Sequence, residues 1–215
     1  MKLWSESFVD GGVIPGPLAF CVIAKENHVA MSNNRNPHLA WSELPSATQS
    51  LVLICHDPDV PSKGDDVNQE GREVPADLPR VDFFHWSLID IPPSLASISE
   101  GEMSASPTPR GKAGPNLEHS GGQMRHGIND YTGWFANDEQ MSGDYYGYDG
   151  PCPPWNDSLL HHYIFTLYAL DVPRLALEGK FDGAQVRAAL AGHVLAQAQI
   201  TGSYTLNPAL QPSLA

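Results

Sequence analysis

One stretch decides the fold class of this 215-residue chain: His161-His-Tyr-Ile-Phe-Thr-Leu-Tyr-Ala-Leu-Asp171. It is rich in aromatic and β-branched residues, which favour strands. Two other stretches indicate the same structure. Leu51-Val-Leu-Ile-Cys55 is a continuous apolar run, typical of a strand buried on both faces, and Phe83–Ile91 is a similar run closed by two prolines. Strands therefore dominate the prediction.

Polar loops separate these strands. The first strand is expected to end at His56-Asp57-Pro58-Asp59, because proline has no N–H group to donate to a sheet. The segments Ser62–Arg80 and Gly101–Pro115 follow the first and second strands and are long for a compact domain. Loops of this length often border a binding site, although they can also be mobile flaps.

The sequence predicts one convincing helix near the C-terminus. Asp182 can cap it with Gln185 in a capping-box position, and apolar residues recur at Val186, Leu190 and Val194. Gly202 is expected to end the pattern, and Ile200–Leu206 is predicted as a last short strand. Before the third strand, Asp157–Leu160 is predicted as a helical turn. The simplest architecture is a single mostly β domain over residues 1–215, an antiparallel sandwich with a C-terminal helix and short peripheral helices.

Composition limits the classes of function. The net charge of −13 disfavours binding to nucleic acids or to anionic membrane surfaces. Met1–Gly12 lacks the apolar core of a secretory signal, and no stretch approaches a membrane span of about 20 residues. Cys21, Cys55 and Cys152 are an odd number without metal-type spacing, so we expect reduced thiols in a soluble, cytoplasmic protein.

Several polar residues lie at the ends of the predicted strands. Asp57 and Asp59 follow the first strand, and His85 interrupts an otherwise apolar second strand. His161 and His162 open the third strand and must face opposite sides of the sheet, so only one of them can share a pocket with His85. Ordinary structural roles remain open: an Asx-turn for the aspartates, and a hydrogen-bonded core position for His85.

A stiff loop precedes the third strand, with the sequence Gly147-Tyr-Asp-Gly-Pro-Cys-Pro-Pro154. Glycines in such loops let backbone N–H groups approach an anion closely. A loop that is only rigid would have the same composition.

These motifs, in this order, resemble those of the phosphatidylethanolamine-binding protein family, and the bacterial Raf kinase inhibitor-like branch is the most similar. The motifs are Asp57-Pro-Asp-Val-Pro61, His85-Trp86, the 147–154 loop and His161-His-Tyr163, and the resemblance covers about residues 41–206. It implies two antiparallel sheets in a Greek-key arrangement, with an anion pocket at one end. The family residues that match are Asp57, Asp59, His85, Gly150, Pro151, His161 and Tyr163.

The resemblance also implies a chemistry. His85 and His161 would donate hydrogen bonds to a phosphate or carboxylate, and Asp57 would orient an imidazole. The N–H groups near Gly150 and the Tyr163 hydroxyl would add donors. Since the motifs hold no Lys or Arg, binding is expected to be modest and to tighten as the pH falls toward about 6.5. His162 stands where many family members carry arginine, and the loops at 62–80 and 127–146 are unusually long.

We therefore predict a soluble protein that binds phosphorylated or carboxylate small anions, including phospholipid head groups, without cofactor, metal or catalysis. The resemblance adds kinase or protease partners, and assembly as a homodimer stays open. A metal-dependent hydrolase using His85, His161 and an aspartate is the alternative, since this set can bind a metal ion. A purely structural or interaction protein without a small-molecule site is the third hypothesis.

Overall fold

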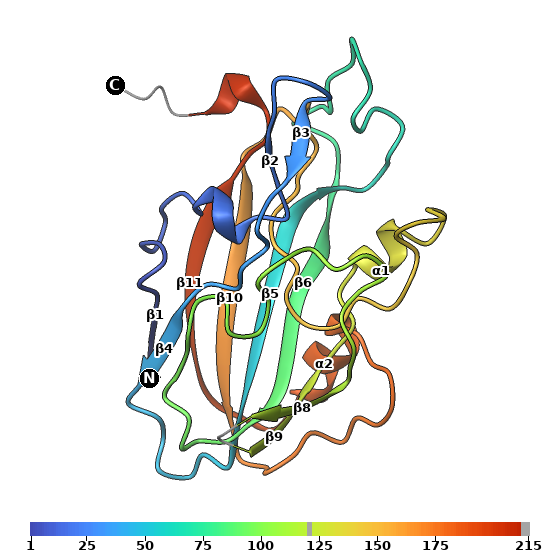
Figure 1. Ribbon diagram of the computed structural model, residues 1–215. Coiled ribbons are helices and arrows are strands. Elements are labelled where there is room, and N and C mark those ends of the chain that lie inside the picture. The colour runs from blue at the N-terminus through green and yellow to red at the C-terminus, as the bar shows by residue number, and fades with distance from the viewer. Residues whose placement is uncertain (120–121, 212–215) are drawn as a thin grey trace.

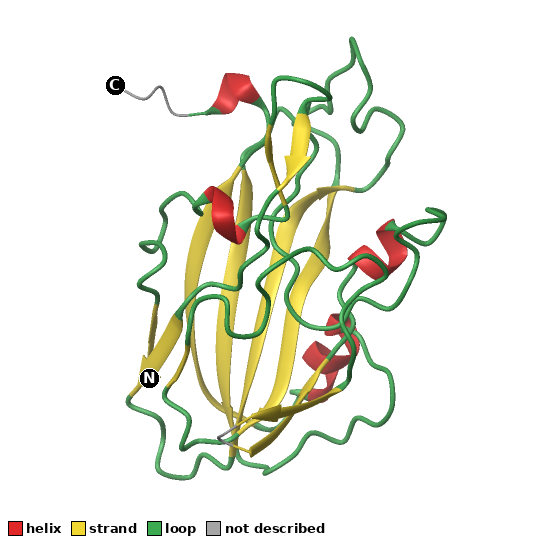
Figure 2. Ribbon diagram, in the orientation of Figure 1, coloured by secondary structure: helices red, strands yellow, loops and turns green. Residues whose placement is uncertain are grey.

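The computed structural model describes residues 1–119 and 122–211, and it is built mainly from antiparallel strands (Figures 1 and 2). The strands are β1 (Lys2–Trp4), β2 (Cys21–Ile23), β3 (Val29–Met31), β4 (Leu39–Ser42), β5 (Ser50–Pro61), β6 (Arg80–Ile91), β7 (Ser97–Ile98), β8 (Asn116–His119), β9 (Gly122–His126), β10 (His161–Leu170) and β11 (Val194–Tyr204). The helices are α1 (Tyr131–Trp134) and α2 (Gly183–Ala189), with 3₁₀ turns at Gly16–Leu18 and Pro208–Leu210.

The largest sheet has the strand order β11-β10-β5-β6-β9-β8, and a smaller one has the order β1-β4-β7. A core of apolar side chains joins the two, so the predicted mostly β sandwich is confirmed. A third sheet, the hairpin β2-β3, was not expected; it lies beside the upper ends of β5 and β10 in Figure 1. α2 covers the other face of the large sheet, where Val186 and Leu190 join a second apolar cluster.

The predicted strands at the centre of the large sheet are confirmed. β5 and β10 pair with each other over residues that are 108 to 120 positions apart in the sequence, such as Phe165 opposite Cys55. Leu51, Leu53 and Cys55 point into the core between the sheets, whereas Val52 and Ile54 point toward α2. Because both faces are covered, a continuous apolar run is the sequence expected for this strand.

The predicted end of the first strand, at His56–Asp59, was wrong: β5 continues to Pro61. The pairing of β5 with β6 shifts between Asp57, which lies opposite Phe83, and Val60, which lies opposite Val81. This irregularity takes Pro58 out of the regular ladder, so the missing N–H group does not stop the strand.

The C-terminal helix was predicted too long. The capping box between Asp182 and Gln185 is present, but α2 ends at Ala189 and Val194 begins β11 with an exposed fraction of 41%. Pairing of β11 with β10 decides the structure here, because it supplies a whole ladder of backbone hydrogen bonds. Gly202 ends no helix; it lies within β11, where a Cβ atom would come 2.4 Å from Ile14.

Two smaller predictions were also wrong. Asp157–Leu160 is not a helical turn, since Asp157 forms a parallel bridge with Val74. The cysteines are not all free, since Cys21 of β2 and Cys152 are joined by a disulfide that ties the hairpin to the 147–154 loop. Cys55 is the free cysteine, and it is buried in the core as expected.

Candidate functional site

A cavity of about 470 Å³ opens at the end of the sheet where the β2-β3 hairpin lies. Its floor carries four polar residues: Asp57, His85, His161 and Tyr163. Its walls are largely apolar and come from the hairpin, α1, the loops and the nearby ends of β5 and β6. They include Phe20, Val29, Met31, Val60, Val67, Phe83, Tyr131, Trp134, Phe135 and Pro153.

Strand alternation brings Asp57, His161 and Tyr163 to this floor. On β5, Asp57 continues the face of Leu53 and Cys55, which points into the core. On β10, His161 and Tyr163 share the same face, while His162 points to the other side. All three floor residues are almost fully buried, with exposed fractions of 1%, 0% and 1%.

A bulge in β6 brings His85 to the floor. Cys55 pairs with Trp86 and His56 pairs with Phe84, so His85 is the extra residue of the bulged strand. Trp86 can then belong to the core while His85 also lines the cavity. The Nδ1 atom of His85 lies 2.7 Å from the backbone oxygen of Asp149. Burial is the main cause of the lowered pKa of His85.

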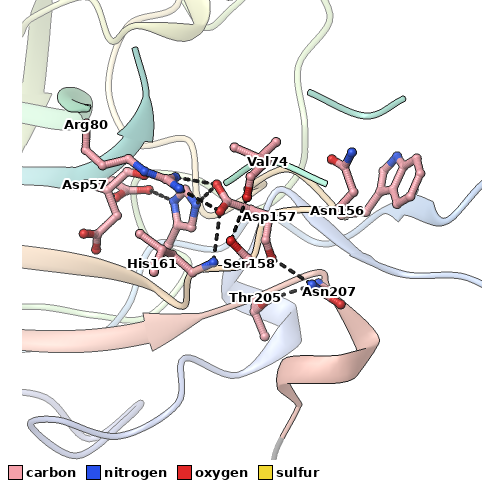
Figure 3. A network of polar contacts seen from close by, with 12 residues as sticks. Asp57, Val74, Arg80, Asn156, Asp157, Ser158, His161, Thr205 and Asn207 are labelled. Carbon is pink, nitrogen blue, oxygen red and sulfur yellow. Dashed lines mark hydrogen bonds and ion pairs between the residues drawn. The ribbon is translucent and has the colours of Figure 1, made fainter. Parts of the chain in front are cut away.

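His161 is held between two carboxylates (Figure 3). Its Nδ1 atom lies 2.7 Å from Oδ2 of Asp57, and its Nε2 atom lies 3.1 Å from Oδ2 of Asp157. Burial acts against the charged form, but hydrogen bonds to the two carboxylates outweigh it and raise the pKa of His161 to about 9. The ring is therefore an imidazolium that donates both of its N–H groups to the protein.

Arg80 completes this network. Its guanidinium makes two hydrogen bonds to the carboxylate of Asp157, at 2.6 and 3.0 Å, and also binds the backbone oxygens of Asp59 and Pro75. Two positive and two negative groups thus alternate along one chain of contacts, in the order Arg80, Asp157, His161 and Asp57. Their formal charges cancel.

Asp57 combines both roles that its sequence position allows. Its Oδ1 atom accepts a hydrogen bond of 2.8 Å from the N–H group of Asp59, which is the Asx-turn, and its Oδ2 atom accepts from His161. The expected orientation of an imidazole by Asp57 is present. However, the second ring nitrogen of His161 is directed to Asp157 and not to the cavity.

The 147–154 loop is fixed by buried polar contacts. The carboxylate of Asp149, which is fully buried, binds Asn34, Asn129 and the Nζ atom of Lys112 at 2.6, 2.8 and 2.7 Å. The N–H group of Gly150 donates to Oδ1 of Asn34 at 2.7 Å. These contacts hold the loop against His85. However, the N–H group of Gly150, which was expected to donate to an anion, already donates to Asn34.

The residues predicted for the site are thus only partly brought together. Asp57, His85, His161 and Tyr163 line one cavity, whereas Asp59, Gly150 and Pro151 do not line it. Asp59 binds the backbone N–H and the Nδ1 atom of His162, at 2.9 and 2.8 Å, on the opposite side of the strand. The prediction that His162 stays outside the cavity is confirmed.

Sequence reasoning missed Asp157 and Arg80. Arg80 closes a loop that was considered only for its length, and Asp157 was assigned to a helical turn. Asp157 lies four residues before His161, but its contact with the ring depends on the loop path that bridges it to Val74. A buried Arg–Asp–His chain leaves no regular spacing in the sequence.

The fold and cavity define a class: a β-sandwich binding protein with a small, partly polar pocket at the end of its central strands. The chain belongs to the phosphatidylethanolamine-binding protein family, whose family model matches residues 4–205. The match extends the resemblance, placed at residues 41–206 from the motifs, to the N-terminal strands.

Relatives and solved structures agree with this assignment. A UPF0098 protein of Methanothermobacter thermautotrophicus is 32% identical over 95% of this chain and 98% of its own length. YbhB, a UPF0098 protein of Escherichia coli, is 27% identical over 95% and 100%. Among crystal structures, the homologue CT736 of Chlamydia trachomatis has 26% identity and a TM-score of 0.61 over 94% of this chain and 95% of its own. Escherichia coli YbcL, at 22% identity, shares the fold, with a TM-score of 0.64 over 95% and 97%.

Two kinds of feature are absent from the described residues. No helix among them is long and apolar enough to cross a membrane. Within the same ranges, no group of three or more His, Cys, Asp and Glu side chains is arranged to hold a metal ion.

Proposed function

We propose that this protein binds small phosphorylated or carboxylate anions in the cavity and acts as a ligand-binding or regulatory module. One observation carries the proposal: Asp57, His85, His161 and Tyr163, drawn from three strands, share the floor of a single cavity whose walls are apolar. Such a combination of a few fixed polar groups with an apolar lining is typical of small-molecule sites.

The proposals on particular ligands and protein partners rest on membership of the phosphatidylethanolamine-binding protein family. Phospholipid head groups are proposed ligands, and kinases or proteases are proposed protein partners that would dock around the same opening. A cytoplasmic location is also proposed, although the disulfide between Cys21 and Cys152 removes the argument from reduced thiols.

Calorimetric titration with phenyl phosphate at pH 6 tests the proposal. His85→Ala should lower the affinity by about one to two decades, the cost of losing a hydrogen bond to a charged group. His162→Ala is the matched control, since its ring is on the opposite face and binds Asp59, and it should leave the affinity unchanged. Absence of binding to the unaltered protein, or equal losses in both variants, would contradict the proposal.

The alternative metal-dependent hydrolase receives no support from the arrangement of its proposed residues. Both N–H groups of His161 donate to carboxylates, so neither ring nitrogen is oriented as a metal ligand. Release of inorganic phosphate during the same titration would favour the hydrolase over a binding protein.

A further inference from the structure

The hydrogen bond between His85 and Asp149 fixes which ring nitrogen carries the proton. A backbone carbonyl oxygen can only accept, so the Nδ1 atom, at 2.7 Å from it, must be the donor. In the neutral ring, Nε2 then carries a lone pair and can only accept. Within residues 1–119 and 122–211 we find no hydrogen-bond partner for Nε2, and His85 lines the cavity. His85 was expected to donate a hydrogen bond to the ligand. In its neutral form, its Nε2 atom can only accept one.

Of the other donors expected at the floor, those of His161 and Gly150 are already used. Both N–H groups of His161 bind carboxylates, and the N–H group of Gly150 binds Asn34. No Lys or Arg is among the described residues that line the cavity. Tyr163 contributes a neutral hydroxyl beside Asp57; burial, followed by the charge of that carboxylate, raises its pKa well above the usual value. A fully ionised phosphate would therefore meet two acceptors, Nε2 of His85 and the Asp57 carboxylate, and no unpaired positive charge.

Some of the groups around His85 raise its pKa and others lower it. Asp57 on β5 and the Asp149 carboxylate favour the protonated ring, and the imidazolium of His161 on β10 opposes it. The rings of Tyr131, from α1, and Tyr163 pack edge-on against His85, with centroids at 5.7 and 5.0 Å. Burial is the largest effect and lowers the pKa of His85, so the ring is neutral near pH 7 when the cavity holds no anion.

We propose that the site binds its anion together with one proton, which is held between Nε2 of His85 and an oxygen of the ligand. This inference rests on the proposed function. The proton comes from solvent and no covalent bond to the ligand changes: a phosphate monoester dianion and the neutral ring take up one proton to form the complex. The site therefore selects anions with an acidic O–H group, such as phosphate monoesters, over permanently ionised anions such as sulfate monoesters.

The apolar walls suggest suitable probes. Phe20, Phe83 and Tyr131 are ring-bearing side chains next to the polar floor, so an aryl group on the ligand would be accommodated. Phenyl phosphate and phenyl sulfate have nearly the same shape. They differ in the second acidic proton of the phosphate, which has a pKa of about 6.

Calorimetry of the whole protein in two buffers with different ionisation enthalpies tests the proposal. At pH 7.5, binding of phenyl phosphate should take up close to one proton, and its affinity should fall about tenfold for each pH unit above pH 7. Phenyl sulfate should bind at least about tenfold more weakly at pH 7.5, the equivalent of one hydrogen bond to a charged group.

Two variants sharpen the interpretation. His85→Gln replaces Nε2 by an amide that can donate to any anion, so proton uptake should fall toward zero and the preference for phosphate over sulfate should disappear. The control variant His162→Ala should keep both the proton uptake and the preference for phosphate over sulfate. Tight phenyl phosphate binding without proton uptake, or equal affinity for phenyl sulfate, would overturn this inference while leaving the proposed function intact. No binding of either probe at any pH would contradict the proposed function itself.

Discussion

The Nε2 atom of His161 lies 3.1 Å from Oδ2 of Asp157, on the side of the ring opposite its contact with Asp57 (Figure 3). This relationship gives His161 a structural function: it links the strand β5 to the loop that carries Asp157 and, through Arg80, to the start of β6. His161, which the sequence predicted together with His85 as a donor to the ligand, instead holds the floor of the cavity in place.

This network predicts a pH dependence of stability. The pKa of His161 is raised to about 9 in the folded protein, from about 6.5 in the unfolded chain. A raised pKa contributes stability that is complete below pH 6.5 and is lost as the pH rises through 9. Urea unfolding at pH 6, 7.5 and 9 should show this fall in the free energy of unfolding. His161→Gln should remove the His161 component, and an unchanged slope in that variant would contradict the assignment of an imidazolium.

Asn156 is predicted to hold the long loop at the rim. Its Nδ2 atom donates to the backbone oxygens of Asp66, Gln69 and Arg72, and its Oδ1 atom accepts from the N–H group of Asn68. Asn156→Ala should lower the free energy of unfolding by about 1–3 kcal/mol, because four part-buried backbone groups of the loop lose their hydrogen-bond partner. It should also speed amide exchange at Asn68.

Gln69→Ala is the control for this variant. The Gln69 side chain makes one long, exposed contact with the backbone oxygen of Val67, at 3.4 Å. Stability and amide exchange should match those of the unaltered protein. Equal effects of the two substitutions would mean that the loop is held by other contacts.

Leu190 and Val194 test the corrected end of the helix. Leu190 is 4% exposed and packs in the cluster beneath α2, whereas Val194 is 41% exposed on β11. Leu190→Ala should destabilise the protein by about 2–5 kcal/mol, and Val194→Ala should change stability by less than about 0.5 kcal/mol. Thermal or urea unfolding measures both. Similar losses at both positions would instead support the longer helix that the four-residue spacing predicted.

Local sequence patterns predicted part of the fold and of the site, and they missed what depends on residues distant in the sequence. Apolar runs predicted β5, β6 and β10 because both faces of these strands are covered, and the short motifs placed Asp57, His85, His161 and Tyr163 in one cavity. The end of α2 was misplaced because pairing with β10 determines the structure of β11, and a local pattern holds no information about that partner. Asp157 and Arg80 were missed for the same reason: their contact joins segments 77 residues apart.

The three cysteines differ in their covalent state. Cys21 and Cys152 form a disulfide between segments 131 residues apart, while Cys55 is buried and free. Burial raises the pKa of the Cys55 thiol well above its usual range, which leaves little of the reactive thiolate. Alkylation followed by mass spectrometry, on protein purified without reductant, should therefore label no cysteine in the folded protein. It should label Cys55 alone after unfolding in urea, and all three after unfolding with reductant. Cys55→Ala should show no label without reductant, which identifies the reactive position. Labelling of all three cysteines in unfolded, unreduced protein would contradict the disulfide and restore the expectation of reduced thiols.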